Sequence, residues 1–196
     1  MAARWFDEIM EYPRQSLSDL AAKLKAGDHN AAAELVDGWY QQIYLFMRRL
    51  GHNRQTSEDL TQETFLRAWQ HIEQLRNGEM LNSWLYRIAS NVSRYYWRLA
   101  KNEELVSISA AEGLDVPDVK SASSETVGNI EQLNRLNRIV AELPMKFKEA
   151  IVLHYMQHLT IAEAAEALGV RQGTYKSRLN RALNKIKKRL SEEIKC

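Results

Sequence analysis

Apolar residues recur every third or fourth position over most of the chain, the spacing that places them on one face of an α-helix. The segment from Ser57 to Ile72 is typical, because its inner face would consist of Leu60, Phe65, Ala68, Trp69 and Ile72. No stretch sustains the two-residue alternation of a half-buried strand. The pattern therefore predicts an all-α fold, with helices over about residues 17–26, 29–50, 56–75, 81–100, 131–142, 145–157, 160–168 and 171–191.

The helical period lapses over residues 102–130, where Ser, Glu and Asp are frequent and Pro117 interrupts the chain. Such a composition is typical of a flexible linker. It would join two small helical domains, one over residues 17–101 and one over residues 131–196. Residues 1–16 form an N-terminal extension, whose aromatic residues favour a short amphipathic cover for the first domain over a hook for a partner.

The segment from Thr160 to Leu183 has the sequence of two helices joined by a tight turn. Thr160 and Glu163 would form a capping box at the start of the first helix. Gly169 suits the left-handed residue that ends this helix. The small Ala165 would let the second helix cross closely, with its inner face built from Leu179, Leu183, Ile186 and Leu190. Together these features predict a helix-turn-helix.

The second of these helices is strongly basic, with eight Lys and Arg and no acidic residue between Arg171 and Arg189. A solvated basic helix or the end of a coiled coil would also carry such a charge run. The preceding turn favours a recognition helix, whose first turns meet base edges and phosphates. The candidates for DNA contact are Arg171, Gln172, Thr174, Lys176, Ser177, Arg178 and Arg181.

Charge is unevenly divided along the chain. The net charge of +2 combines a neutral stretch over residues 1–100, −4 over residues 101–135 and +6 over residues 136–196, so the last part suits a polyanion. Cys196 is the sole cysteine, which excludes a disulfide or a thiolate metal cluster within one chain. Because the sequence shows no signal peptide and no run near about 18 apolar residues, we expect a cytoplasmic protein without stable membrane insertion.

Two segments of the first domain present a second, polar face. Thr56 or Ser57 would cap the helix over residues 56–75, and its outer stripe comprises Asp59, Gln62, Glu63, Leu66 and Arg67. This stripe is either plain solvent surface or a docking face with a small apolar centre.

The helix after it would turn Trp84, Leu85, Ile88, Ala89, Val92 and Leu99 toward the core. Its opposite side carries Arg87, Asn91, Arg94, Tyr95 and Arg98. Basic groups attract phosphate, and aromatic rings stack on unpaired bases with about 1–3 kcal/mol per base. Aromatic residues at helical spacing are more often core than stacking platforms, which favours a core position over a stacking role for each of Tyr95, Tyr96 and Trp97.

Three motifs together resemble the extracytoplasmic-function sigma factors: DLTQETFLRAW from Asp59, WLYRIASN from Trp84 and GTYKSRLNRAL from Gly173, with Leu143-Pro144 ahead of the last. The resemblance implies a protein that binds core RNA polymerase, directs it to promoters and assists DNA melting. Residues 17–101 would be region 2 and residues 131–196 region 4.

The family also implies a role for each surface. The stripe from Asp59 to Arg67 would contact the β′ clamp helices, and region 4 would read the minus-35 element near the β flap. The basic face of the following helix would capture the minus-10 element. The connection from His71 to Asn82 would pocket a flipped minus-10 base, with Asn77, Glu79, Met80 and Asn82 as candidates. An anti-sigma factor is an implied partner, and the linker would let the domains close around it or spread along a promoter.

Two positions depart from the family pattern. Tyr175 stands where a small β-branched core residue is usual, so either its ring packs in a modified corner or its hydroxyl reaches the DNA backbone. Tyr95 stands where the family often has Asp, which affects the expected minus-10 preference.

Two other functions fit the sequence less well. A conventional helix-turn-helix regulator would need a receiver or ligand-binding domain, and the sequence has no such pattern. A nucleic-acid enzyme would need clustered ligands or a nucleophile with its base. His154 and His158 have chelating spacing but lack a third ligand, and a surface or packing role is favoured. We therefore expect no catalytic residue, no metal and no cofactor.

Overall fold

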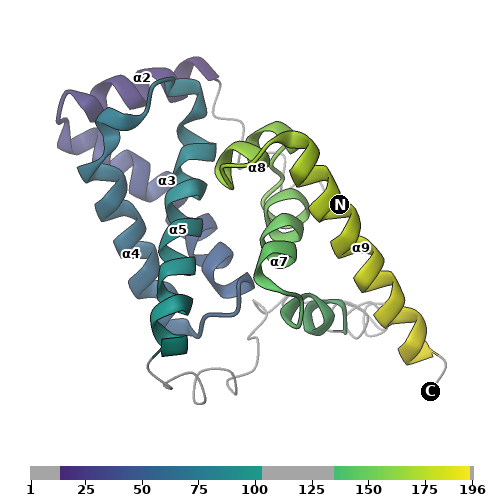
Figure 1. Ribbon diagram of the computed structural model, residues 1–196. Coiled ribbons are helices and arrows are strands. Elements are labelled where there is room, and N and C mark those ends of the chain that lie inside the picture. The colour runs from purple at the N-terminus through teal and green to yellow at the C-terminus, as the bar shows by residue number, and fades with distance from the viewer. Residues whose placement is uncertain (1–13, 103–134, 195–196) are drawn as a thin grey trace, which may run out of the picture.

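All regular elements in the described part of the chain, residues 14–102 and 135–194, are helices, as the computed structural model in Figure 1 shows. The first domain comprises α2 (Arg14–Lys25), α3 (His29–Arg49), α4 (Arg54–Gln70), the 3-10 turns η1 (Ile72–Gln74) and η2 (Gly78–Met80), and α5 (Leu81–Asn102). The second comprises a helical stretch over 135–141, α7 (Met145–Ile151), the π-helical turn η4 (Val152–Met156), α8 (Ile161–Ala167) and α9 (Gln172–Ile194). The all-α prediction is confirmed. Most of the predicted extension and nearly all of the predicted linker lie outside the described residues.

The start and the end of α4 differ from the prediction. The helix begins at Arg54, and its cap is Asn53, whose side-chain oxygen accepts from the backbone N–H of Thr56 at 2.8 Å. Asn53 precedes both Thr56 and Ser57, and an Asn with extended backbone caps a helix as well as a Ser does. The cap is therefore neither Thr56 nor Ser57. The predicted helix to residue 75 stops at Gln70, where the chain tightens into η1.

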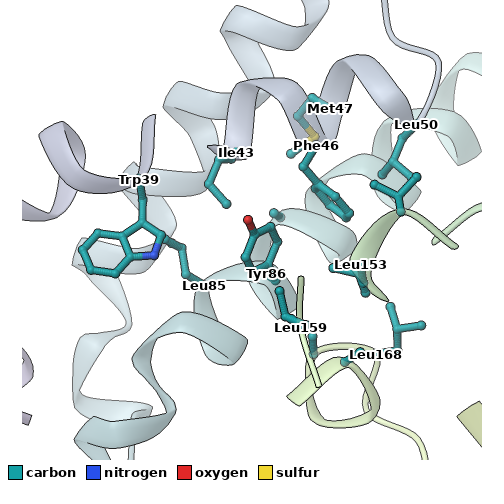
Figure 2. Packing of buried hydrophobic residues seen from close by; sticks show 14 of the residues in the cluster. Trp39, Ile43, Phe46, Met47, Leu50, Leu85, Tyr86, Leu153, Leu159 and Leu168 are labelled. Atoms are coloured by element: carbon teal, nitrogen blue, oxygen red, sulfur yellow. The ribbon is translucent and has the colours of Figure 1, made fainter. Parts of the chain in front are cut away.

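The core of the first domain lies between α3 and α5. Trp39, Ile43 and Phe46 on α3 meet Leu85 and Tyr86 on α5, all 2% exposed or less (Figure 2). Burying a large apolar side chain of this kind stabilises a fold by about 1.5–3 kcal/mol. The polar edge of the Trp39 ring is also satisfied, because its indole N–H donates to Asn82 Oδ1 at 3.0 Å.

Tyr175 is buried in the helix-turn-helix, which decides between the two roles left open for it. Its ring is fully enclosed, and its hydroxyl donates to the carbonyl of Ala150 at 2.8 Å. Burial raises the pKa of the Tyr175 hydroxyl, so the group stays a hydrogen-bond donor. The ring therefore packs in the corner between α7 and α9, and the hydroxyl does not face the outer surface of α9.

The two domains pack directly on each other. Tyr86 on α5 contacts Phe46 edge to face at 5.4 Å, and its hydroxyl donates to Gln157 Oε1 of the second domain at 2.8 Å. Leu153, Leu159 and Leu168 of the second domain join the same buried cluster as the first-domain residues. In Figure 2 they lie on the far side of Tyr86 from Trp39, and in Figure 1 α8 lies against α5.

Two leucines that periodicity placed inside are on the surface. Leu99 is 41% exposed and Leu183 is 37% exposed. On α9 the buried line runs through Tyr175, Leu179, Ala182 and Ile186, which leaves Leu183 at its edge. Leu99 lies at the corresponding edge of the buried face of α5. The inward prediction is wrong at both positions because each leucine lies at the border of the buried face of its helix, where solvent reaches it.

Candidate nucleic-acid interface

The predicted docking stripe forms one continuous outer face of α4. The inner side of the helix is closed by Thr61 and Thr64, whose buried hydroxyls donate to the carbonyls one turn earlier. On the outer side Leu66 is 52% exposed, among polar neighbours. Arg67 Nε donates to Glu63 Oε1 at 2.6 Å, so two of the five candidates are paired. Exposed or half-buried together on this face are Asp59, Gln62, Glu63, Leu66 and Arg67.

A groove of about 1180 Å³ separates this face from α5. Its floor and walls come from the end of α4, the connection through η1 and η2, and the first turns of α5. Four predicted minus-10 residues line it: Asn77, Met80, Arg87 and Asn91. The structure thus gathers residues from a loop and a helix at one site, as a pocket for an extruded base would need.

Sequence reasoning missed several residues of this groove. Trp84 and Ile88, expected in the core, do pack against it, but both are half-buried and also line the groove. His71 and Arg76 line it too. Trp84 directly precedes the buried Leu85, so it lies at the border of the buried face of α5 and not at its centre. That border position was the sign in the sequence that the indole is partly exposed. An indole in the wall gives the groove an aromatic surface on which a base can stack.

The connection is held in one conformation by its own hydrogen bonds. Asn77 Oδ1 accepts from the backbone N–H of Glu79 at 3.0 Å, and Ser83 Oγ donates to the Met80 carbonyl at 3.1 Å. The side-chain oxygen of Asn82, also predicted to face a base, accepts a hydrogen bond from the Trp39 indole N–H. Met80, 41% exposed, is therefore the residue of this connection with the most open apolar side chain.

The aromatic run at the end of α5 divides into one exposed ring and two packed ones. Tyr95 is 44% exposed, and the guanidinium groups of Arg98 and Arg67 lie 5.2 Å and 5.9 Å from its ring centre. Tyr96 and Trp97 are half-buried against His52, at ring distances of 5.2 Å and 4.9 Å. Tyr95 is therefore the ring of this run that is available to nucleic acid.

His52 is the buried centre of this aromatic group. It is 3% exposed, and its Nε2 lies 2.8 Å from Ser93 Oγ. Burial and the neighbouring positive charge of Lys148 lower the pKa of His52 to about 3. The ring is therefore neutral at physiological pH and serves packing rather than proton transfer.

The helix-turn-helix has the geometry that its sequence predicted. Thr160 and Glu163 form the reciprocal capping box, and Gly169 adopts φ 63°. Six of the seven predicted minus-35 residues are exposed on α9 or just before it, and Arg178 is half-buried: Arg171, Gln172, Thr174, Lys176, Ser177, Arg178 and Arg181. The buried Tyr175 in their midst fixes the helix on its inner side.

Two predicted minus-10 arginines are held by the second domain. Arg94 donates to both carboxylate oxygens of Glu149, from Nε at 2.7 Å and from Nη2 at 3.1 Å. Arg87 lies 3.5 Å from Glu166. Burial raises the pKa of Glu149, and the Arg94 guanidinium opposes that rise. The face of α5 that was expected to meet DNA therefore already has acidic partners.

The two histidines with chelating spacing show no metal geometry. His154 Nδ1 lies 2.8 Å from the carbonyl of Leu159, and His158 has a positive φ of 55°. Over residues 14–102 and 135–194 no group of three or more His, Cys, Asp or Glu side chains is arranged to hold a metal. Within the same ranges no helix has the length and apolar character to cross a bilayer.

Comparison with known proteins gives two family matches and close relatives. Residues 35–103 match Sigma-70 region 2, and residues 133–186 match Sigma-70, region 4. The ECF RNA polymerase sigma factor SigW of Bacillus subtilis (strain 168) is 30% identical over 176 residues, covering 87% of this chain and 94% of that protein.

Two solved structures share the fold. One is CnrH in complex with the cytosolic domain of CnrY, with a TM-score of 0.67 and 23% identity, covering 89% of this chain and 97% of that one. The other is the sigma factor RpoE from Bartonella quintana with the anti-sigma factor NepR, with a TM-score of 0.60 and 23% identity, covering 81% and 96%.

Proposed function

The chain belongs to the extracytoplasmic-function (ECF) sigma factors of RNA polymerase, and we propose that its exposed faces divide the work of transcription initiation. As a sigma factor it binds core polymerase and directs it to promoters. The observation that carries the assignment of surfaces is that the three family motifs lie on separate exposed faces: the outside of α4, the groove beside α5 and the start of α9. The chemistry of RNA synthesis stays with the polymerase, and the place of action is the cytoplasm, where polymerase and promoters lie.

The outer face of α4 is the proposed polymerase contact. Leu66 supplies a small apolar centre, and Asp59 and Gln62 beside it are exposed. A centre of this kind with charged specifiers around it suits a coiled-coil partner such as the β′ clamp helices. The Glu63–Arg67 pair presents both signs of charge at the edge of the face.

The groove between α4 and α5 is the proposed minus-10 site. Met80 and Trp84 offer surfaces for an unstacked base, while Arg87 and Asn91 can meet phosphate and base edges. Tyr95 and Arg98 extend the same face along α5. Such a surface stabilises opened DNA more than duplex, which favours melting.

The first turns of α9 are the proposed minus-35 reader. The seven polar and basic side chains lie around Tyr175, whose hydroxyl donates to the Ala150 carbonyl and fixes the inner side of the helix. Arg178 and Arg181 lie one turn apart and suit bidentate contact with guanine or phosphate. The same domain is the proposed site for the β flap.

An anti-sigma factor is the proposed regulator. Two proteins of the same fold have been solved as complexes: CnrH with the cytosolic domain of CnrY, and the sigma factor RpoE with the anti-sigma factor NepR. An inhibitor that covers the α4 face or the α5 groove would block polymerase or promoter binding.

Reconstituted transcription tests these assignments. Purified chain is added to core polymerase, and transcript starts are mapped on a promoter library. Asp59→Ala with Glu63→Ala should weaken core binding, with Asp19→Ala and Asp37→Ala as the matched control pair on exposed positions of α2 and α3. Arg178→Ala with Arg181→Ala should weaken minus-35 recognition and leave core binding unchanged. A full-length chain without affinity for bacterial core enzyme at modest salt would contradict the proposal.

A further inference from the structure

Arg67 lies where the outer face of α4 meets the groove beside α5. The helices α4 and α5 pack against each other (Figure 1). The Arg67 guanidinium lies 5.9 Å from the ring centre of Tyr95 on α5. Arg67 also lines the groove, together with Arg87 and Asn91 of the proposed minus-10 site. It therefore belongs to two surfaces, the stripe proposed for polymerase and the face proposed for DNA.

Tyr95 brings a second guanidinium group to the same place. Arg98 is exposed and lies one turn further along α5, with its guanidinium 5.2 Å from the Tyr95 ring centre. Both arginines are within the distance of about 6 Å at which a cation is attracted to an aromatic ring. The ring thus holds cations from two helices beside each other, although like charges repel.

Glu63 balances one of the two positive charges. Its Oε1 accepts a hydrogen bond from Arg67 Nε at 2.6 Å. A guanidinium group has five N–H donors, so this bond orients Arg67 and leaves its Nη groups for another acceptor. Among the described residues, Glu63 is the acid that pairs with this cluster. The cluster of Arg67, Tyr95 and Arg98 therefore keeps one positive charge in excess, which suits an anion.

We propose that Arg67 and Arg98, held in place by Tyr95, bind a backbone phosphate of promoter DNA. Guanidinium groups donate to phosphate oxygens in a fork geometry, and these charge-assisted hydrogen bonds are short and strong. Because Arg67 also lines the groove, a strand whose bases occupy the groove has its backbone close to this site. The inference rests on the proposed minus-10 role of the groove, and it adds a site where α4 itself contacts DNA.

The residue type at position 95 suits this arrangement. An aspartate there would pair with the arginines and repel a phosphate, whereas a neutral ring orients them and leaves their charge available to DNA. The two guanidinium groups also cover part of the ring surface on which a base would stack. Tyr95 is therefore a positioning residue, whose ring acts on DNA through the two arginines.

The salt dependence of promoter binding tests the site. Core polymerase saturated with each full-length variant is titrated against a fluorescent promoter fragment at several salt concentrations, so that differences in core affinity do not enter. Arg67→Gln with Arg98→Gln should weaken binding by about tenfold, the order expected for hydrogen bonds to a charged group. The slope of log affinity against log salt should fall by about one, as for the loss of one phosphate contact.

A charge-matched pair provides the control. Lys23→Gln with Arg54→Gln lowers the net charge by the same amount at two exposed positions of the first domain. Arg54 pairs with Glu58 on α4 in the same way as Arg67 pairs with Glu63. This control pair should keep the wild-type slope. Equal losses in the two double variants would show that net charge alone is responsible, and would overturn the proposal.

Three variants of Tyr95 test its positioning role. Tyr95→Phe keeps the ring and should keep the wild-type slope and affinity. Tyr95→Leu should lower both, and Tyr95→Asp should lower them further, because the new carboxylate takes the place of the phosphate. A loss of affinity at full slope in Tyr95→Leu would mean that the ring stacks on a base, and equal losses in Tyr95→Phe and Tyr95→Leu would mean that the hydroxyl binds DNA. Either result would contradict the proposal.

Failure of this site and failure of the proposed function give different results. If the wild-type complex binds the promoter and Arg67→Gln with Arg98→Gln keeps the full slope, the phosphate site is absent and the minus-10 role of the groove stands. If the wild-type complex does not distinguish the promoter from a fragment with an altered minus-10 element, the role of the groove fails, and the phosphate site fails with it.

Discussion

Tyr175 shows how a single residue can fix a recognition helix from its inner side. Its hydroxyl satisfies the Ala150 carbonyl inside the domain. Tyr175→Phe should therefore lower the free energy of unfolding by about 1 kcal/mol and leave affinity for minus-35 duplex DNA unchanged. Urea unfolding and fluorescence anisotropy measure the two quantities. A loss of DNA affinity at unchanged stability would mean that the hydroxyl serves DNA after all.

The sequence alone could not make that choice. Position 175 lies between exposed residues of a basic segment, and a tyrosine there is compatible with packing or with phosphate contact. Burial depends on α7, a separate element whose position against α9 no local pattern gives. In contrast, Gly169 and the Thr160–Glu163 pair were predictable because the chemistry of a helix end is local.

His52 gives the protein a stability that depends on pH. Its ordinary pKa of 6.5 falls to about 3 in the folded chain. Between those values the unfolded chain binds a proton that the folded chain refuses, so acid favours unfolding. The contribution of His52 should be complete above pH 6.5 and decline toward pH 3, with a slope of at most about 1.4 kcal/mol per pH unit.

Unfolding free energies at several pH values check this expectation. The variant His52→Phe keeps an aromatic ring against Trp97 and removes the titration, so its stability should depend less on pH over that window. Glu149 acts in the opposite direction, because its raised pKa makes its contribution decline as pH rises. Parallel pH curves for His52→Phe and the wild type would show that the ring titrates normally.

At the scale of elements, α2 is a support for the groove that the family match does not include. The match to Sigma-70 region 2 begins at residue 35, beyond the end of α2. Gly78 in η2 approaches α2 so closely that a Cβ would lie 2.7 Å from Ser18 Cα. Leu20 and Leu24 anchor α2 in the core beneath this contact. The position of the connection from His71 to Met80 thus depends on an element outside the motif.

Gly78→Ala should force α2 and η2 apart. The expected cost is about 1–3 kcal/mol of unfolding free energy, as for other overpacked sites, together with weaker discrimination among minus-10 sequences in transcription. Gly173→Ala is the matched stability control, because a Cβ there meets no atom within 4 Å. Urea unfolding compares the two variants. If Gly78→Ala is as well tolerated as Gly173→Ala, the close contact does not position the groove.

Helix faces and helix ends were unequally predictable. The exposed stripe on α4 follows from a period of 3.6 residues and appears as expected, whereas Leu99 and Leu183 lie at the borders of their faces. Trp84 was assigned to the core from the same period; it packs against the core but is only partly buried, and it also lines the groove. The borders of a face depend on the width of the neighbouring helix, which the residues of one helix do not encode.

At the scale of the whole molecule, the contact between the domains is the feature that no local pattern indicated. Tyr86 and Gln157 are far apart in sequence and meet by a hydrogen bond of 2.8 Å. Burial raises the pKa of the Tyr86 hydroxyl, which therefore remains a donor to Gln157. Motifs identified the function of each domain because they are short and local. The contact between the domains joins residues whose separate roles gave no reason to pair them.

A continuous core predicts that the two domains unfold together. Four of the five tryptophans, Trp39, Trp69, Trp84 and Trp97, lie in the first domain and none lies in the second, so the change in their fluorescence follows the first domain, while far-ultraviolet circular dichroism follows both. In the wild-type chain the two signals should follow one transition in urea.

Arg49→Met removes the hydrogen bond to Met156 and leaves that carbonyl unsatisfied, at a cost of about 1–3 kcal/mol. The two transitions should then separate, because the domains lose a shared contact but keep their own cores. Arg189→Met is the control, since Arg189 pairs with Glu142 inside the second domain and is well exposed. Coincident transitions in Arg49→Met, at the midpoint of the wild type, would show that this contact contributes nothing to coupling.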